Sequence, residues 1–247
     1  MNLLVDLGNS CCKFAVEEEG KIEKYQSQKY GPFGKLYSVK SLCGQFSDAR
    51  AIVISSVLST EMNAQIKDTL TSDGAENIYF LDPVKNSFGI VLAYADPSTF
   101  GVDRVAALIG ANEKYIGNSC IVDIGTAVTI DVLSANGEHK GGVIFPGVAS
   151  MEKALLSNTK IQTDQTADVE FNVLANSTEN AIHSGCMSAL VGGVEYVVNN
   201  MSSNYDGFDQ VILTGGGADL IKPYLSFSVR IEDTLVLDGL SIVSQNI

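Results

Sequence analysis

The chain has 247 residues, of which 45% are hydrophobic and 18% charged, and its formal net charge is −13. This length allows two domains with buried cores, and the hydrophobic content excludes a disordered chain. The acidic balance argues against nucleic-acid binding, which needs clustered Lys and Arg side chains. We find no apolar stretch approaching the roughly 18 residues that span a bilayer, and Asp6 interrupts the first apolar run too early for a signal peptide. We therefore expect a cytoplasmic protein without a nucleic-acid or membrane partner.

The first half of the chain alternates predicted strands and helices. It opens with a hairpin, in which apolar strands at 2–5 and 14–16 flank a polar turn that contains Gly8. The pattern then predicts strands at 21–26, 51–56 and 78–81, and helices at 35–42, 60–70 and 102–111. Thr60 is the expected N-cap of the second helix, and 89–100 is an expected loop.

The second half repeats this opening. Strands at 120–122 and 128–130 flank a second glycine turn, and a further strand at 142–145 stops at Pro146-Gly147. We expect a helix at 148–157, then a long helix capped by Ser177 or Thr178 that runs toward Asn199. A strand at 210–213 leads into a glycine-rich turn and another helix. The boundary falls near 116–118, which predicts domains at 1–116 and 117–247.

The two hairpin turns have nearly the same sequence: Asp6-Leu-Gly-Asn-Ser and Asp123-Ile-Gly-Thr-Ala. Each turn offers backbone N–H groups, a hydroxyl and one carboxylate, the groups that hold a polyphosphate and its divalent cation. One copy alone is better explained as an ordinary hairpin. Two copies half a chain apart indicate a duplicated domain with one loop from each copy facing a shared cleft, an arrangement that suits an ATP-dependent phosphotransferase.

Two further motifs add chemistry. The segment Thr214-Gly-Gly-Gly-Ala lets backbone lie flat against a planar ligand; alone it is more often a tight corner, but beside two phosphate loops it predicts an adenosine contact. The segment Gly101-Val-Asp-Arg104 begins a helix, where a capping and surface-charge role is the better explanation taken alone. In a kinase, Asp103 would accept a hydroxyl proton and Arg104 would bind a substrate carboxylate in bidentate fashion.

Cysteine and histidine point to no other chemistry. The five cysteines lie mostly in apolar segments without a C-x-x-C pair, which predicts reduced core thiols. With only His139 and His183, a Ser-His-Asp hydrolase or a His-rich metal site has no support.

Taken together, the motifs resemble those of type III pantothenate kinases, in the superfamily of acetate kinase, sugar kinases, heat-shock chaperones and actin. The resemblance spans the chain and rests on the following segments, in order: Asp6-Leu-Gly-Asn-Ser-Cys-Cys-Lys13, Tyr94-x-x-Pro97, Gly101-Val-Asp-Arg104, Asp123-Ile-Gly-Thr-Ala-Val-Thr-Ile-Asp131, Gly141-Gly-Val-Ile-Phe-Pro-Gly147, Asn176-Ser-Thr178 with Gly185, and Thr214-Gly-Gly-Gly217. Two departures stand out: Ser10 replaces the common Thr, and Cys11-Cys12 is unusual before Lys13, but neither removes a needed donor.

The resemblance implies a duplicated ribonuclease H-like, actin-like α/β fold and ATP-dependent phosphorylation of pantothenate to 4'-phosphopantothenate, the first step of coenzyme A biosynthesis. It implies Asp103 as general base and a pantothenate pocket lined by Tyr94, Gly101, Val102 and Arg104. It also implies magnesium near Asp6, and potassium or ammonium at Asp123. The implied ATP-binding residues are Asp6, Leu7, Gly8, Asn9, Ser10, Cys11, Cys12, Lys13, Thr126, Gly215 and Gly216. Finally, Thr178 would reach the partner's pantothenate in a homodimer with shared active sites.

Three alternatives stay open. A related kinase could act on a sugar or another carboxylic acid, and some members of this family are described as accessory factors in transcription. A structural ATPase of the actin type is disfavoured, because Gly101–Arg104 would then have no substrate to serve.

Overall fold

The computed structural model describes residues 1–31, 34–46, 48–84, 88–161, 163–164, 168–204 and 207–247. They form two compact units: Met1–Ile116 with Ala135–Lys140 and Thr234–Ile247, and Gly117–Ser134 with Gly141–Asp233. We call them the first and second unit. The second unit differs from the expected domain 117–247, because two segments of that stretch belong to the first unit.

The first unit contains a mixed sheet in which both faces are covered. Its strand order is β3-β2-β1-β4-β5, with β1 at Asn2–Leu7, β2 at Cys11–Glu18, β3 at Lys21–Lys29, β4 at Ile52–Ser56 and β5 at Ile78–Phe80. Neighbours β1 and β2 run antiparallel, whereas β1 and β4 run parallel. Every residue of β1 and β4 is buried, as expected for central strands with helices on both sides.

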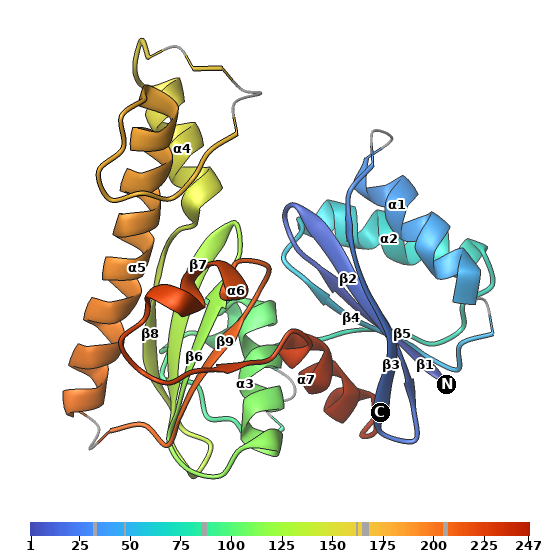
Figure 1. The fold of residues 1–247 in the computed structure, drawn as a ribbon. Coiled ribbons are helices and arrows are strands. Elements are labelled where there is room, and N and C mark those ends of the chain that lie inside the picture. Colours follow the sequence, from blue (N-terminus) through green and yellow to red (C-terminus); the bar gives the residue numbers. More distant parts are fainter. Residues whose placement is uncertain (32–33, 47, 85–87, 162, 165–167, 205–206) are drawn as a thin grey trace. The chain divides into compact units, whose positions relative to one another are not determined.

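Helices cover the two faces of this sheet. They are α1 at Lys35–Cys43, α2 at Thr60–Ser72, α3 at Val102–Lys114 and α7 at Leu235–Ser244, with short 3-10 turns at Gly44–Phe46 and Pro97–Thr99. Figure 1 shows α1 and α2 on one side of the sheet and α7 on the other. The N-cap of α2 is Ser59, whose hydroxyl accepts from the N–H of Met62 at 3.2 Å, so the expected cap at Thr60 is wrong by one residue.

The helices α3 and α7 cross at glycines. A Cβ atom at Gly110 would overlap the carbonyl of Leu235, and one at Gly239 would overlap the carbonyl of Ala106. Only glycine therefore allows the two backbones to approach this closely. The expected elements did not include α7, although Asp238 and Ser241 are spaced three residues apart, as on the polar face of an amphipathic helix.

The second unit repeats the sheet of the first, strand for strand. Its order is β10-β9-β6-β7-β8, with β6 at Ser119–Ile124, β7 at Ala127–Leu133, β8 at His139–Pro146, β9 at Gln210–Thr214 and β10 at Arg230–Ile231. Again the first two strands, β6 and β7, are antiparallel, and β6 pairs in parallel with β9. The helices are α4 at Val148–Ser157, α5 at Thr178–Asn204 and α6 at Ala218–Ile221, with a 3-10 turn at Lys222–Tyr224.

The long helix α5 packs on this second sheet through Met187, Leu190, Val194 and Val198, all of which are buried. Its 27 residues include an 18-residue window with a mean hydropathy of 1.2, and 33% of that window is buried. Among the residues that the structure describes, α5 is the one helix whose length and composition would suit a membrane span. The expectation that no apolar stretch approaches this length is therefore wrong for α5, although its buried residues serve a core.

Candidate functional site

The first predicted loop is the turn between β1 and β2. Asp6 pairs with Lys13 across the ladder, and Leu7 pairs with Cys12. Because side chains alternate along a strand, Leu7 and Cys12 point into the core beneath α1 and α2, whereas Asp6 and Lys13 share the opposite face. A ligand at this turn could meet only the backbone of Leu7 and Cys12, but it could meet the charged groups of the other two.

Tyr30, a residue that the sequence did not single out, holds this turn. Its hydroxyl donates to the carbonyl of Gly8 at 2.9 Å, and the N–H of Gly8 donates to the carbonyl of Cys11 at 3.1 Å. Burial raises the pKa of Tyr30, with the charges of Cys12 and Asp6 as further causes, so its hydroxyl stays a donor. Tyr30 carried no signal in the sequence, because only the pairing of β2 with β3 brings it to the turn.

The second predicted loop has the same frame and is shorter. Asp123 on β6 pairs with Thr129 on β7, and the N–H of Gly125 donates to the carbonyl of Ala127 at 3.0 Å. The position opposite the aspartate thus carries a neutral hydroxyl in this loop, where the first loop carries an ammonium group.

The start of α4 fixes the second loop. The carbonyl of Thr126 accepts from the N–H of Gly147 at 3.0 Å and from the hydroxyl of Ser150 at 2.6 Å. A Cβ atom at Gly147 would overlap the carbonyl of Gly125, so the strand that ends at Pro146 must be followed by glycine here. Thr126 itself is exposed on the outer side of the loop.

The glycine-rich turn after β9 lies against the second loop. Gly215 has φ +84° and leaves no room for a side chain beside the carboxylate of Asp123. Gly217 donates its N–H to the carbonyl of Ile124 at 2.9 Å. Gly216, in contrast, is exposed and has open space where a Cβ would lie. The middle of this turn is therefore the part of the backbone that a planar ligand could approach.

The segment Gly101–Arg104 begins α3 in the first unit. The carboxylate Oδ1 of Asp103 accepts from the N–H of Arg104 at 2.8 Å, which turns the side chain back over the start of the helix. A Cβ atom at Gly101 would lie 2.8 Å from this same oxygen, so glycine makes room for the carboxylate. Val102, the first residue of the helix, is half-buried beside it.

Arg104 is 5% exposed and lies among aromatic rings. Its guanidinium carbon is 4.2 Å from the centre of the Phe100 ring, and its Nη1 donates to the hydroxyl of Tyr94 at 3.2 Å. The rings of Tyr94 and Phe100 meet edge to face at 4.8 Å. This packing holds a permanent charge in one orientation, since the guanidinium stacks on a ring and is hydrogen-bonded at one end.

His139 completes the aromatic cluster, with its ring 4.9 Å from that of Phe100. It is 2% exposed and lies on the segment Ala135–Lys140 of the first unit. The N–H of His139 donates to the carbonyl of Val91 at 2.9 Å. Sequence reasoning missed both aromatic partners. Phe100 directly precedes the motif and could have been found by its position, whereas His139 gave no signal.

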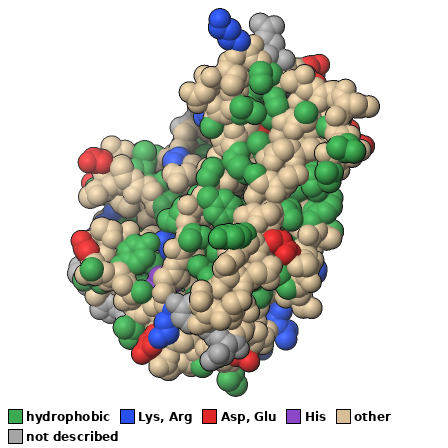
Figure 2. Space-filling model, turned by 90° about the vertical axis from the view of Figure 1, so that its left-hand side faces the viewer, with side chains coloured by type: hydrophobic (Ala, Val, Ile, Leu, Met, Phe, Trp, Pro, Cys, Tyr) green, Lys and Arg blue, Asp and Glu red, His purple; other side chains and the backbone are tan. Residues whose placement is uncertain are grey.

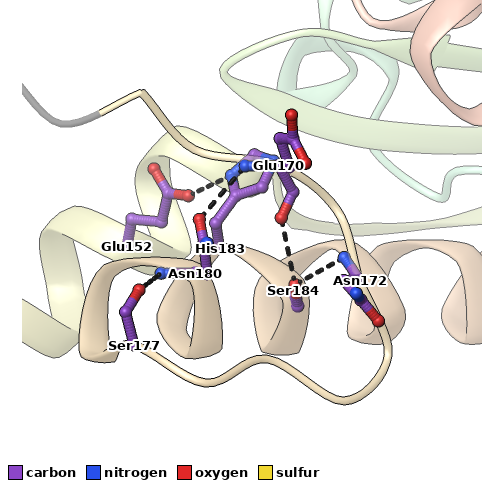
Figure 3. Close-up of polar contacts among 7 residues, drawn as sticks. All are labelled: Glu152, Glu170, Asn172, Ser177, Asn180, His183 and Ser184. Carbon is purple, nitrogen blue, oxygen red and sulfur yellow. Dashed lines mark hydrogen bonds and ion pairs between the residues drawn. The ribbon is translucent and has the colours of Figure 1, made fainter.

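Thr178, the expected contact to a partner's substrate, belongs to the second unit. It is the exposed first residue of α5, and Ser177 caps the helix by accepting from the N–H of Asn180 at 3.2 Å. Figure 3 shows this cap near His183, whose Nδ1 lies 2.8 Å from Oε1 of Glu152 on α4.

The structure thus gathers the expected site residues into three groups. The first unit holds the turn of Asp6, Leu7, Gly8, Asn9, Ser10, Cys11, Cys12 and Lys13, and also the group of Tyr94, Gly101, Val102, Asp103 and Arg104. The second unit holds Asp123, Thr126, Gly215 and Gly216.

The loops fit a nucleotide with its cation. Each offers glycine backbone and one carboxylate at a strand end, and the turn at Gly216 forms an open backbone surface. Within the described residues, no three His, Cys, Asp or Glu side chains gather as a metal site. A cation here would therefore complete its shell with phosphate oxygens and water, as magnesium does beside nucleotides.

Comparison with known proteins agrees with this geometry. The sequence profile of the type III pantothenate kinase family matches residues 2–200. A type III pantothenate kinase of Nitrosococcus oceani is 34% identical over 100% of this chain and 94% of its own length. That of Fervidobacterium nodosum is 36% identical over 88% of this chain and 87% of its own.

Solved structures share the fold. A Campylobacter jejuni protein described as a Baf family transcriptional activator has a TM-score of 0.60 at 21% identity, covering 99% of this chain and 98% of its own. MreB5 of Spiroplasma citri, bound to ADP, has a TM-score of 0.51 at 10% identity, covering 100% of this chain and 97% of its own. The predicted duplicated, actin-like α/β fold is confirmed. With the profile and both relatives in agreement, the chain belongs to the type III pantothenate kinase family.

Proposed function

We propose that this protein transfers the terminal phosphoryl group of ATP to the primary hydroxyl of pantothenate, the first step of coenzyme A biosynthesis, with Asp103 as the general base. Membership in the family supports the reaction. The observation that supports the site is the buried, ring-stacked guanidinium of Arg104 directly beside a carboxylate at the start of α3.

Arg104 suits the carboxylate of the acceptor. Its guanidinium can bind a carboxylate in bidentate fashion, and the contacts to Phe100 and Tyr94 orient it before substrate arrives. A pantothenate carboxylate bound there would place the rest of that molecule near the start of α3.

Asp103 suits the hydroxyl of the acceptor. Its hydrogen bond from the N–H of Arg104 and its place in the first turn of α3 both favour the ionised carboxylate. A base must be ionised to accept the hydroxyl proton as the oxygen attacks phosphorus. Gly101 makes room for this carboxylate, and Tyr94 forms a hydrogen bond with Arg104. Both residues would therefore help to shape the same pocket.

The two loops suit the nucleotide. The backbone of the first turn, Lys13 and Thr126 would hold phosphate oxygens, Asp6 would hold magnesium, and Gly215 with Gly216 would face the adenosine. When bound, the divalent cation neutralises phosphate charge. Lys13 adds a fixed positive charge on the same face as Asp6.

A monovalent cation, potassium or ammonium, is proposed at Asp123. The residue opposite Asp6 is Lys13, but the residue opposite Asp123 is Thr129, which brings no charge. A second carboxylate beside an anionic triphosphate is unfavourable unless a cation lies between them. The second loop therefore lacks the lysine that the first loop carries opposite its aspartate.

A homodimer is proposed through the outer side of α5. Figure 2 shows hydrophobic side chains gathered on the face of the molecule where α5 lies. Large exposed hydrophobic side chains on α5 and on the segment before it include Tyr196, Val173 and Leu174, and a groove of about 560 Å³ is lined in part by Gly192. In this proposal, Thr178 reaches the pantothenate site of the partner subunit.

A cytoplasmic location is part of the proposal. All five cysteines are free thiols, as expected in a reducing compartment. Burial raises the pKa of Cys43 to about 12, so this thiol is neutral and unreactive at physiological pH.

The direct test is ADP formation that depends on pantothenate, with magnesium and with potassium or sodium. A panel of sugars and small hydroxy acids, assayed in the same way, separates this activity from that of a related kinase. Turnover with a sugar alone would support the related kinase, and binding without any turnover would support an accessory regulatory factor.

The role of the base is tested by Asp103→Asn. This variant should fold and bind ATP, while turnover falls by roughly 10²–10⁴-fold, the usual contribution of a general base. Arg104→Lys is the matched comparison, because it keeps the charge but loses the bidentate geometry and should mainly raise the KM for pantothenate. Turnover of Asp103→Asn within a few-fold of the parent would reject the role.

Shared sites are tested by mixing inactive chains. Asp103→Asn chains and chains disabled at Thr178 should regain partial activity when subunits exchange, since some heterodimers hold one intact site. A fully active monomer in light scattering, or no recovery after proven exchange, would contradict the dimer.

A further inference from the structure

Two buried hydroxyl groups lack a hydrogen-bond partner in the part of the chain that the structure describes. They belong to Ser55, which is 0% exposed, and Thr214, which is 1% exposed. A buried hydroxyl without a partner loses its bonds to water and gains nothing in exchange. Such groups are rare in folded proteins, so each calls for a physical explanation.

The two hydroxyls occupy the same place in the duplicated fold. Ser55 on β4 pairs with Asp6 on β1, and Thr214 on β9 pairs with Asp123 on β6. In a parallel pair, residues in register point to the same face, and the strands lie about 4.8 Å apart. Each hydroxyl is therefore beside the carboxylate of one predicted loop.

The neighbouring serine shows that this strand end can satisfy a hydroxyl. Ser56 donates to Oδ1 of Asn63 at 2.6 Å and accepts from the N–H of Leu58 at 3.2 Å. Its hydroxyl organises the turn between β4 and α2. Ser55 lies one residue earlier, on the opposite face of the sheet, and has no such structural task.

We propose that Ser55 and Thr214 are positioning residues for the nucleotide and its cations. The inference rests on the proposed ATP site and deepens it. The carboxylates of Asp6 and Asp123 would hold the cations that accompany the bound nucleotide. Each hydroxyl then donates to its neighbouring carboxylate, directly or through one ordered water, and holds the orientation that the cation requires.

The proposal predicts an unusual pair of effects for Ser55→Ala and Thr214→Val. Without ligand, the midpoint of thermal unfolding should stay the same or rise, because each variant removes an unpartnered polar group. The Kd of magnesium-ATP, measured by calorimetry without pantothenate, should rise about 10-fold, the effect of losing one hydrogen bond to a charged group. Thr214→Ser, which restores a hydroxyl, should recover the affinity.

Ser56→Ala is the matched control. It removes a hydroxyl with two partners, so the midpoint should fall while the Kd of magnesium-ATP stays unchanged. The cation requirement separates the two sites: Ser55→Ala should raise the magnesium concentration for half-maximal ATP binding, and Thr214→Val should raise the potassium concentration.

The outcomes distinguish this inference from the proposed function. If the parent binds magnesium-ATP and both variants bind it equally well, the positioning role is rejected and the kinase proposal stands. Variants that behave like Ser56→Ala, with a lower midpoint and an unchanged Kd, would likewise show a merely structural role. A parent that does not bind magnesium-ATP would overturn both.

Discussion

The turn between β1 and β2 and the turn between β6 and β7 carry the same motif in the same register, yet different parts of the chain hold them. Tyr30, which follows β3, holds the first turn through the carbonyl of Gly8. The second turn is held by the start of α4, through Gly147 and Ser150. Duplication thus preserved the strand frame and the aspartate, while the supports around each turn diverged.

The difference in charge has the larger consequence. Opposite the aspartate stands Lys13 in one turn and Thr129 in the other. The following turns differ too: the chain leaves β4 through Ser56 and Val57 but leaves β9 through three glycines. The first turn therefore carries a lysine on the same face as its aspartate, whereas the second turn lies beside open glycine backbone.

The largest expected effect comes from Gly215. Gly215→Ala should lower the free energy of unfolding by about 3 kcal/mol or more, because the residue has φ +84° and its side chain would collide with the carboxylate of Asp123. Urea unfolding measures this loss. Gly216→Ala is the control one position away, where open space should keep the change below about 1 kcal/mol. Equal losses at both glycines would contradict the described packing.

The next largest effect is expected from giving the second turn the positive charge that the first turn carries. Thr129→Lys should place an ammonium group opposite Asp123, as Lys13 lies opposite Asp6. Activity in sodium-only buffer should then rise about 10-fold over the parent, which corresponds to roughly 1.4 kcal/mol. Thr129→Met, of similar length and without charge, should give no such gain. An unchanged potassium requirement in the lysine variant would remove the cation from Asp123.

The smallest effects concern the supports. Tyr30→Phe removes one hydrogen bond to the first turn, and Ser150→Ala removes one from the second. Each should destabilise the ordered conformation of its turn by about 1 kcal/mol and raise the KM for ATP about 5-fold or less. Steady-state kinetics at saturating pantothenate measures both. If neither variant shifts the KM for ATP, these hydrogen bonds do not order the turns for the nucleotide.

The sequence predicted what depends on neighbours along the chain. Both hairpins follow from apolar runs around a glycine, and the start of α3 at Val102 follows from the motif before it. The contact of Tyr30 with the first turn and that of His139 with Phe100 could not be predicted in this way. Strand pairing brings Tyr30 to its place, and a segment distant in sequence brings His139. The roles of the site residues remain predictions that the variants above test.

The helix α7 was not among the expected elements, and its position has a consequence for how the protein is made. It covers the face of the first sheet that includes Leu4 and Val53, in contact with β1 and β4. A ribosome synthesises β1 first and α7 more than two hundred residues later. The first unit therefore cannot complete its core as it emerges, and its folding must wait for the second unit to be synthesised. The first strands are thus synthesised long before the first unit can finish folding. One apolar face of their sheet stays uncovered until α7 has been synthesised.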